Sequence, residues 1–180
     1  VEKQDNVYYY LTLLNENYPM PGLKAGTEEE ILKGMYLSQP ATPSAGNAPR
    51  VQLLGSGTIL RESMAAQELL LKDWGVAADV WSCPSFNELG REGQEVARWN
   101  LLHPLEKPRK AFVTTQLEPH AGPVVASTDY MKAFVEQIRP FIPEGRSYTV
   151  LGTDGFGRSD FRYRLREHFE VNRHYITVAA

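Results

Sequence analysis

Short apolar runs alternate with longer segments of helical periodicity over most of the chain. The apolar runs predict strands, and they lie at residues 51–54, 78–82, 110–115, 124–127, 148–152 and in a terminal stretch from Tyr175. The intervening segments predict helices, at residues 59–74, 86–99, 130–141 and 160–169. This order predicts a three-layer α/β sandwich, in which helices cover both faces of a mostly parallel, mixed sheet.

The amino-terminal region follows a different pattern. The run VYYYLTLLN, Val7–Asn15, is rich in aromatic and aliphatic side chains and predicts a buried strand. Proline and glycine follow it, and then Thr27 with Glu30 forms a capping-box pattern that predicts a helix over residues 28–36. Residues 38–50 are rich in proline, alanine, serine and glycine, which predicts a linker and a domain boundary there.

Composition narrows the classes of function. The chain has 180 residues, 42% of them hydrophobic, and a net charge of -3. These values predict one main domain with a sizeable core. Lysine and arginine are dispersed, which disfavours a nucleic-acid partner. The apolar stretches fall short of the roughly 20 residues that span a bilayer, which disfavours a membrane.

The single cysteine, Cys83, excludes an internal disulfide framework, and this usage is typical of a cytoplasmic protein. The chain begins with Val1 and not with methionine, and residues 175–180 form an apolar run without a polar tail. Because such a run exposes apolar surface unless something covers it, we expect the chain to be a fragment of a longer protein.

Two glycine-containing loops between a strand and a helix are candidate sites. Gly55-Ser56-Gly57 is similar to a dinucleotide-binding turn, but Leu60 occupies the third glycine position and Asp79 lies at the wrong end of the next strand. A tight turn is the favoured interpretation. The loop 153–159 carries Asp154 and Arg158, and it serves either a site at the carboxyl edge of the sheet or only the next helix, capped by Ser159 or Asp160 with Phe156 in the core.

The remaining polar candidates are few. Glu16, Asn17 and Tyr18 follow the predicted strand, where they could orient a substrate or move a proton, or simply form a turn. The histidines at positions 103, 120, 168 and 174 lack metal-ligand spacing, so we expect no metal site. Cys83 is expected to be a small core residue rather than a nucleophile.

Several phrases, spread in order over nearly the whole chain, closely resemble the homodimeric pyruvate dehydrogenase E1 family. They are VYYYLTLLNENYPMP, VQLLGSGTILRE, RWNLLHPLEKPR, VVASTDYMK and YTVLGTDGFGRSD. The last phrase also resembles the C-terminal domain of the wider transketolase superfamily. The resemblance implies that residues 1–20 end a middle domain, that residues 21–50 link it onward with a short helix, and that residues 51–180 form the C-terminal domain.

The same resemblance implies the parent activity and its partners. The intact enzyme would decarboxylate pyruvate on thiamine diphosphate and reductively acetylate the lipoyl group of the E2 acetyltransferase. The cofactor and Mg²⁺ would be held by two domains absent here, so the fragment alone is expected to bind no cofactor and to be inactive. The parent would be a homodimer, and this domain would serve mainly dimerisation and the active-site channel.

The resemblance also assigns roles to residues of this chain. Glu16, Asn17 and Tyr18 match a run that lines the active-centre channel, whereas Pro19 stands where some members carry a histidine and cannot donate a proton. Asp154, Phe156, Arg158 and Ser159 are expected to shape the interface and channel rather than to break bonds. Alternative functions are a non-catalytic assembly module or, less favoured, a nucleotide-binding oxidoreductase domain.

Overall fold

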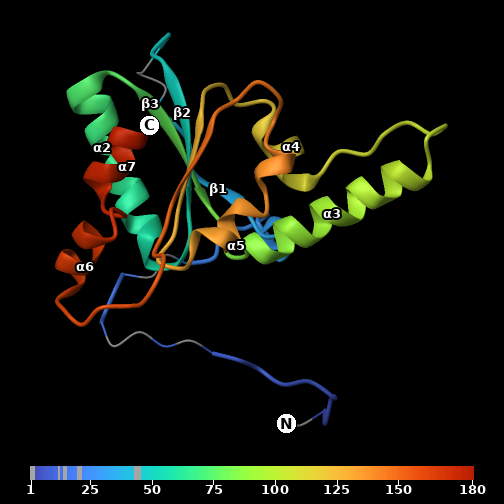
Figure 1. Cartoon of the computed structure of the whole chain (residues 1–180), viewed down its shortest axis with the longest axis horizontal. Coiled ribbons are helices and arrows are strands. Elements are labelled where there is room, and N and C mark those ends of the chain that lie inside the picture. Colours follow the sequence, from blue (N-terminus) through green and yellow to red (C-terminus); the bar gives the residue numbers. More distant parts are fainter. Residues whose placement is uncertain (1–2, 12, 14–15, 20–21, 43–45) are drawn as a thin grey trace.

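The protein is described here by a computed structural model, which covers residues 3–11, 13, 16–19, 22–42 and 46–180. A five-stranded sheet in the order β1-β3-β2-β4-β5 lies between two layers of helices (Figure 1). Its strands are β1 (Tyr36–Gln39), β2 (Arg50–Gly55), β3 (Ala77–Ser82), β4 (Val124–Ser127) and β5 (Tyr148–Leu151). All of them except β1 run parallel to their neighbours, which confirms the predicted mixed, mostly parallel sheet.

The central strands are buried on both faces, as continuous apolar runs in parallel sheets usually are. Every residue of β3 and of β4 is buried, and so is β2 beyond Arg50. The chain places β3 on one side of β2 and then crosses to place β4 on the other side. The loops after β2 and β4 therefore diverge at a topological switch point, where open α/β sheets bind ligands.

One face of the sheet is covered by the first long helix and the last one. The turn η2 (Gly57–Ile59) leads into α2 (Leu60–Trp74), and α7 (Arg173–Ala179) packs beside it (Figure 1). Helix α6 (Arg162–His168) lies near the start of α2. Ala66, Leu70 and Ile176 form a buried cluster with apolar residues of the strands, so this layer completes one half of the core.

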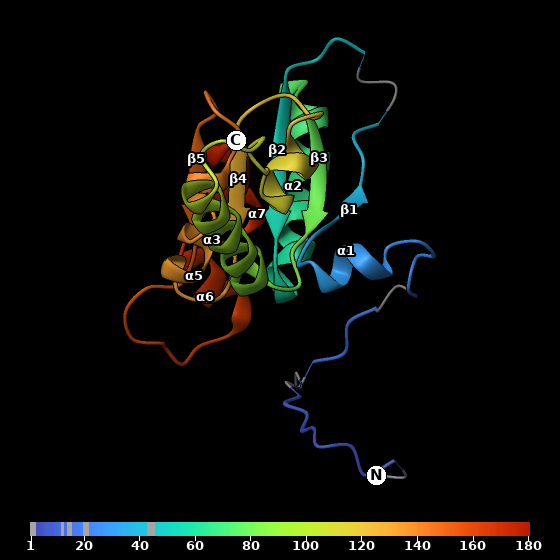
Figure 2. The same ribbon diagram turned by 90° about the vertical axis from the view of Figure 1, so that its right-hand side faces the viewer.

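The opposite face is covered by α3 (Phe86–Leu102), α4 (Phe112–Leu117), α5 (Lys132–Glu136) and η3 (Arg139–Phe141) (Figure 2). Ser85 caps α3, because its side-chain oxygen accepts a hydrogen bond from the Glu88 N–H at 3.1 Å. Leu89, Leu117 and Ile138 carry the second core cluster on this side. No helix in the described residues is long and apolar enough to cross a membrane.

Two strands predicted from short apolar runs were wrong, because both segments are helices. Residues 112–117 form α4, whose Val113 and Leu117 are buried one helical turn apart. Residues 173–179 form α7, which Asn172 caps by accepting hydrogen bonds from the N–H groups of His174 and Tyr175. Short apolar runs fit a buried helix as well as a strand, and the packing against neighbours decides between them.

The predicted amino-terminal strand was wrong as well for the residues that can be compared. Residues 7–11 and 13 form no strand, and Tyr8 is 92% exposed. Thr12, Leu14 and Asn15 lie outside the described residues. A strand needs a neighbouring edge for its hydrogen bonds and a layer that covers its side chains. The described part of this chain supplies neither to the segment.

The predicted helix before the sheet is shorter, and a strand follows it. Helix α1 covers only Glu28–Leu32, and the Thr27 hydroxyl donates to the Lys24 carbonyl oxygen at 2.6 Å instead of capping the helix. Residues 36–39, which were expected at the end of the helix and the start of a linker, form β1 antiparallel to β3. The predicted limits of the domains stay predictions.

Candidate functional site

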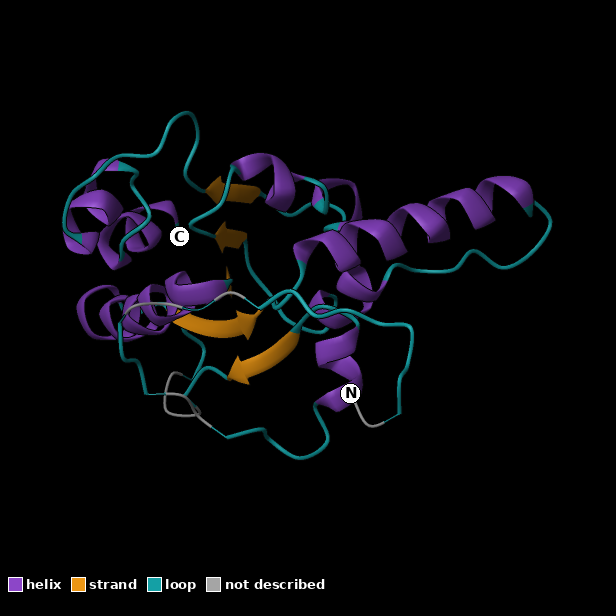
Figure 3. Ribbon diagram, turned by 90° about the horizontal axis from the view of Figure 1, so that it is seen from below, coloured by secondary structure: helices purple, strands orange, loops and turns teal. Residues whose placement is uncertain are grey.

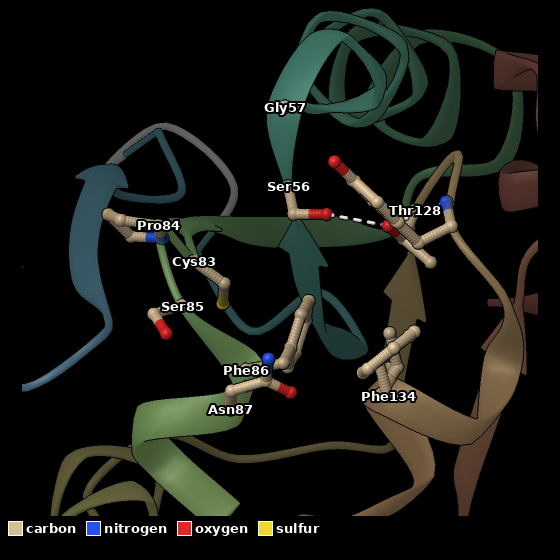
Figure 4. A pocket seen from close by; sticks show the side chains of 11 residues that line it. Ser56, Gly57, Cys83, Pro84, Ser85, Phe86, Asn87, Thr128 and Phe134 are labelled. Carbon is tan, nitrogen blue, oxygen red and sulfur yellow. Dashed lines mark hydrogen bonds between the residues drawn. The ribbon is translucent and has the colours of Figure 1, made fainter. Parts of the chain in front are cut away.

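The carboxyl edge of the sheet carries a row of hydroxyl groups at the topological switch point. The Ser56 hydroxyl, just after β2, donates to the Thr128 Oγ1 at 2.8 Å, just after β4 (Figure 4). Beneath them the hydroxyls of Ser63 and Ser127 lie 3.0 Å apart. The first bond joins the loops after β2 and β4, and the second joins α2 to the end of β4, so the edge is held as one unit.

A cavity of about 390 Å³ opens beside these hydroxyls. Its lining mixes hydroxyl, amide and aromatic side chains (Figure 4) and consists of Ser56, Gly57, Cys83, Pro84, Ser85, Phe86, Asn87, Thr128, Tyr130, Phe134 and Val135. Cys83 is buried, and burial raises the pKa of its thiol far above the ordinary value. A thiol with a raised pKa is a poor nucleophile, which supports the interpretation of Cys83 as a core residue.

Gly55 and Gly57 serve the turn between β2 and α2. A Cβ atom on Gly55 would lie 2.8 Å from the Leu60 Cα and 2.8 Å from the Ser63 Oγ, so only glycine lets the helix approach the strand this closely. Gly57 has a φ of 54°, a conformation that favours glycine. Asp79 lies near the amino-terminal end of β3, away from this turn. Packing explains Gly55 and backbone conformation explains Gly57, without a dinucleotide.

The Glu16-Asn17-Tyr18 segment is engaged by arginines of the helical layer. The Tyr18 hydroxyl donates to the Glu16 carboxylate at 2.7 Å, and the Arg162 guanidinium lies 2.9 Å from the same carboxylate. Arg166 approaches the Tyr18 hydroxyl at 3.4 Å, and the Arg61 guanidinium lies 4.3 Å from the centroid of the Tyr18 ring. These contacts tie the segment to α2 and α6.

The environment of Glu16 favours its ionised form. The hydrogen bond from Tyr18 is the main cause that lowers the pKa of the Glu16 carboxyl, and the positive charges of Arg162, Arg166 and Arg61 lower it further. A carboxylate held in this way is suited to accept hydrogen bonds and not to supply a proton at neutral pH. Asn17 and Pro19 are exposed beside it.

The loop after β5 is tied to α5 by one residue, Asp154, and exposes Phe156 and Ser159. The Asp154 carboxylate accepts a hydrogen bond from the Lys132 N–H at 3.0 Å, which ties the loop to the start of α5. Phe156 is 94% exposed and therefore does not enter the core of this chain. Ser159 is exposed and does not cap α6, whose N-cap residue is Phe161. The alternative in which this loop only caps the helix and plugs the core was therefore wrong.

Arg158 of the loop after β5 lies close to the arginines that contact the Glu16-Asn17-Tyr18 segment. It lines a hollow of about 260 Å³ together with Arg162 and Arg166, the same arginines that contact Glu16 and Tyr18. Asp129 contributes a carboxylate to this hollow, and Leu165 lies among its apolar residues. The structure therefore gathers the predicted loop and the predicted polar segment around α6.

A buried carboxylate beside this region was missed in the sequence. Glu62 accepts hydrogen bonds from the Arg173 N–H at 3.0 Å, from the Arg173 guanidinium at 2.9 Å and from the Arg166 guanidinium at 3.2 Å. Burial raises the pKa of Glu62, but the bonds and charges of the two arginines outweigh it and lower the pKa overall. The sequence signal for its burial is the four-residue spacing of Glu62, Ala66 and Leu70, which places all three on one face of α2.

Comparison with known proteins places this fold in a family. The profile of the transketolase-like C-terminal domain matches residues 34–172. The chain belongs to this family. Solved transketolases from Campylobacter jejuni and Pichia stipitis superpose with a TM-score of 0.51 over 89% of this chain and 19% of theirs, at 20% and 17% identity. At this identity the likeness concerns the fold alone.

Closer relatives of this transketolase-like domain are described as pyruvate dehydrogenase E1 components. The Cupriavidus necator protein is 60% identical over 178 residues, and the Pseudomonas aeruginosa protein is 55% identical over 180 residues. The Escherichia coli K12 protein is 55% identical over 179 residues. These matches include 99% or more of this chain, but the chain spans only 20% of the length of each relative.

The residues of this transketolase-like domain do not form a recognisable metal centre in the described part of the chain. No group of three or more histidine, cysteine, aspartate or glutamate side chains is placed there to hold an ion. The His103 ring stacks on Trp99, and the His120 ring lies edge-on to Trp81, so both have structural contacts.

Proposed function

We propose that this chain is the C-terminal domain of a pyruvate dehydrogenase E1 subunit. The parent would decarboxylate pyruvate with thiamine diphosphate and Mg²⁺ held by its other domains, and would acetylate the lipoyl group of E2 in the cytoplasm. The observation that carries this proposal is the identity of 55–60% to E1 components along the whole of this chain. Thiamine diphosphate supplies the carbanion chemistry, and protein groups position the reactants.

In this proposal the chain acts by placing segments and not by breaking bonds. Glu16, Asn17 and Tyr18 would line the active-centre channel, and Arg61, Arg162 and Arg166 would hold Glu16 and Tyr18 there. The exposed loop with Asp154, Phe156, Arg158 and Ser159 would shape the channel and the contact with a second subunit of a homodimer. Without its parent domains the fragment would be inactive.

A second function is favoured by one observation. The Glu16 carboxylate is already engaged by the Tyr18 hydroxyl and by Arg162, which leaves it less free to meet a substrate. This arrangement supports an assembly role, in which the segment fastens its neighbouring domain to α2 and α6. Such a role would matter for the subunit and its dimer but not for the chemical step.

Substitution in the full-length subunit separates the two functions. If the segment lines the channel, we expect Glu16→Gln and Tyr18→Phe to lower kcat by about ten- to a hundredfold, since small misplacements in an active site cost rates of this order. The dimer should stay intact by light scattering, and turnover should be followed with pyruvate and lipoylated E2. Glu28→Gln, an exposed carboxylate on α1, is the matched control.

Normal turnover of both variants would contradict the channel role. If turnover is normal and the dimer weakens, the assembly role stands in its place. A full-length subunit that fails to decarboxylate pyruvate even without substitution would overturn the proposed E1 function itself.

A further inference from the structure

The outer part of α3 and the loop behind it form an arm that leaves the body of the domain. We call residues 94–110 the α3 arm. The buried residues of α3 are Phe86, Leu89, Gly90 and Gly93, and none of the residues of the arm is buried. Figures 1 and 3 show the helix and its return loop extending well beyond the layers that cover the sheet. Packing on the core therefore does not account for this half of the helix.

The tip of the arm is nevertheless held in a defined shape. The Trp99 ring stacks on the His103 ring with 4.4 Å between their centroids, and the Arg109 guanidinium lies 3.7 Å from the Trp99 centroid. The Asn100 side chain donates to the Arg109 carbonyl oxygen at 2.9 Å and accepts from its N–H at 2.8 Å. The return loop is thus fastened to the helix, and the arm keeps its shape without help from the core.

The rigid tip presents leucines to solvent. Leu101 is 78% exposed, Leu102 is 57% exposed and Leu105 is 100% exposed. Exposed leucines clustered at the end of a projecting element are typical of an interaction surface, since covering them removes apolar area from water. Because the tip is already ordered, little conformational entropy is lost when a partner covers it.

We propose that the α3 arm docks, through Leu101, Leu102 and Leu105, into an apolar pocket on another domain of its own full-length subunit. This rests on the proposed function, in which the chain is part of an E1 subunit. The curated relatives are about five times as long as this chain, because it spans 20% of each of them. A contact within one polypeptide avoids the entropy of association, so a domain of the same subunit is the favoured occupant.

Charge indicates the chemistry of the receiving surface. Arg98, Lys107 and Arg109 flank the leucines in the sequence, whereas Glu106 is the one acidic residue between positions 98 and 109. A pocket that accepts the tip should therefore have an apolar floor and acidic side chains at its rim.

A photo-reactive side chain tests the proposal in the full-length subunit. Benzoylphenylalanine replaces Leu105, which is fully exposed in this chain and should tolerate the change. Irradiation should produce a cross-link that runs at the mass of one subunit on a denaturing gel and maps by mass spectrometry outside residues 21–180. The same variant irradiated in denaturant is the control and should lose that cross-link.

Other products decide against the proposal. A covalent dimer of subunits would show that a second copy covers the tip, a conjugate that forms only with E2 would show a separate partner, and no cross-link would show a free arm. If the variant does not fold, hydroxyl-radical footprinting of the unmodified subunit replaces it. The three leucines should then be labelled less in the full-length subunit than in the 180-residue chain. Pyruvate turnover of the same sample reports separately on the proposed E1 function, so each idea can fail alone.

Discussion

Asp79 lies near the amino-terminal end of β3, where it is only 3% exposed and joins segments far apart in the sequence. Its carboxylate accepts hydrogen bonds from the Ala41 N–H at 2.8 Å and from the Gln52 amide at 3.0 Å. His120 lies 3.2 Å from it, and Arg50 lies 3.8 Å away. A buried charge must be matched by such partners, so this residue fastens the segment after β1 to the sheet.

We predict that Asp79→Asn destabilises the 180-residue chain by about 2 kcal/mol at neutral pH, the usual magnitude for a hydrogen-bonded charge. Burial raises the pKa of Asp79, but its bonds to Ala41, Gln52 and His120 lower it overall. The stabilisation is therefore fully present above the ordinary carboxyl pKa of 3.8, and it is lost as the pH falls through the lower value of the folded state.

Urea unfolding of both forms across acidic pH measures this difference. The two curves should converge in acid, because the protonated wild-type carboxyl then resembles the amide. A difference that persists unchanged to the lowest pH at which the chain folds would show that the charge of Asp79 is not its source.

At the scale of elements, Glu62 joins α2 to the two last helices. Its buried carboxylate forms ion pairs with Arg166 of α6 and with Arg173 of α7. The apolar contacts of α7 with α2 come from a few residues such as Ile176. The stability of α6 and α7 therefore depends on these ion pairs as well as on apolar packing.

We predict that Glu62→Ala lowers the free energy of unfolding by about 3 kcal/mol, because it leaves two arginines without their buried partner. Hydrogen exchange should lose protection mainly in residues 162–179. Glu95→Gln is the matched control, since it removes one partner of the exposed pair with Arg91 on α3 and should cost less than about 1 kcal/mol. Equal losses in the two variants would contradict a special role for Glu62.

The helices and strands differ in how well local patterns predict them. The predicted ranges 59–74, 86–99 and 124–127 agree closely with α2, α3 and β4, because long periodic segments and buried parallel strands have clear patterns. The runs at 110–115 and from Tyr175 predict strands but form helices, because a short apolar run suits either element. Strand β1 was not predicted, since its pairing partner β3 is distant in the sequence.

At the scale of the whole molecule, the carboxyl edge of the sheet decides which ligands are plausible. Gly55 is required where α2 meets β2, and Ser82 and Cys83 stand at the end of β3 where a dinucleotide-binding domain would carry an acidic residue. We predict that titration of the chain with NADH produces no saturable change in its fluorescence. Stoichiometric binding at micromolar concentration would contradict this and would revive the oxidoreductase alternative.

The alternation of apolar and periodic segments was sufficient to predict the layered fold, because each element carries in its own residues the face that it buries. The resemblance of whole phrases was sufficient to predict the family. Local sequence could not decide that Glu16 and Tyr18 would meet Arg61, Arg162 and Arg166, or that Glu62 would be buried between α6 and α7. Those contacts join residues more than forty positions apart, so only the packing of complete elements brings their charges together.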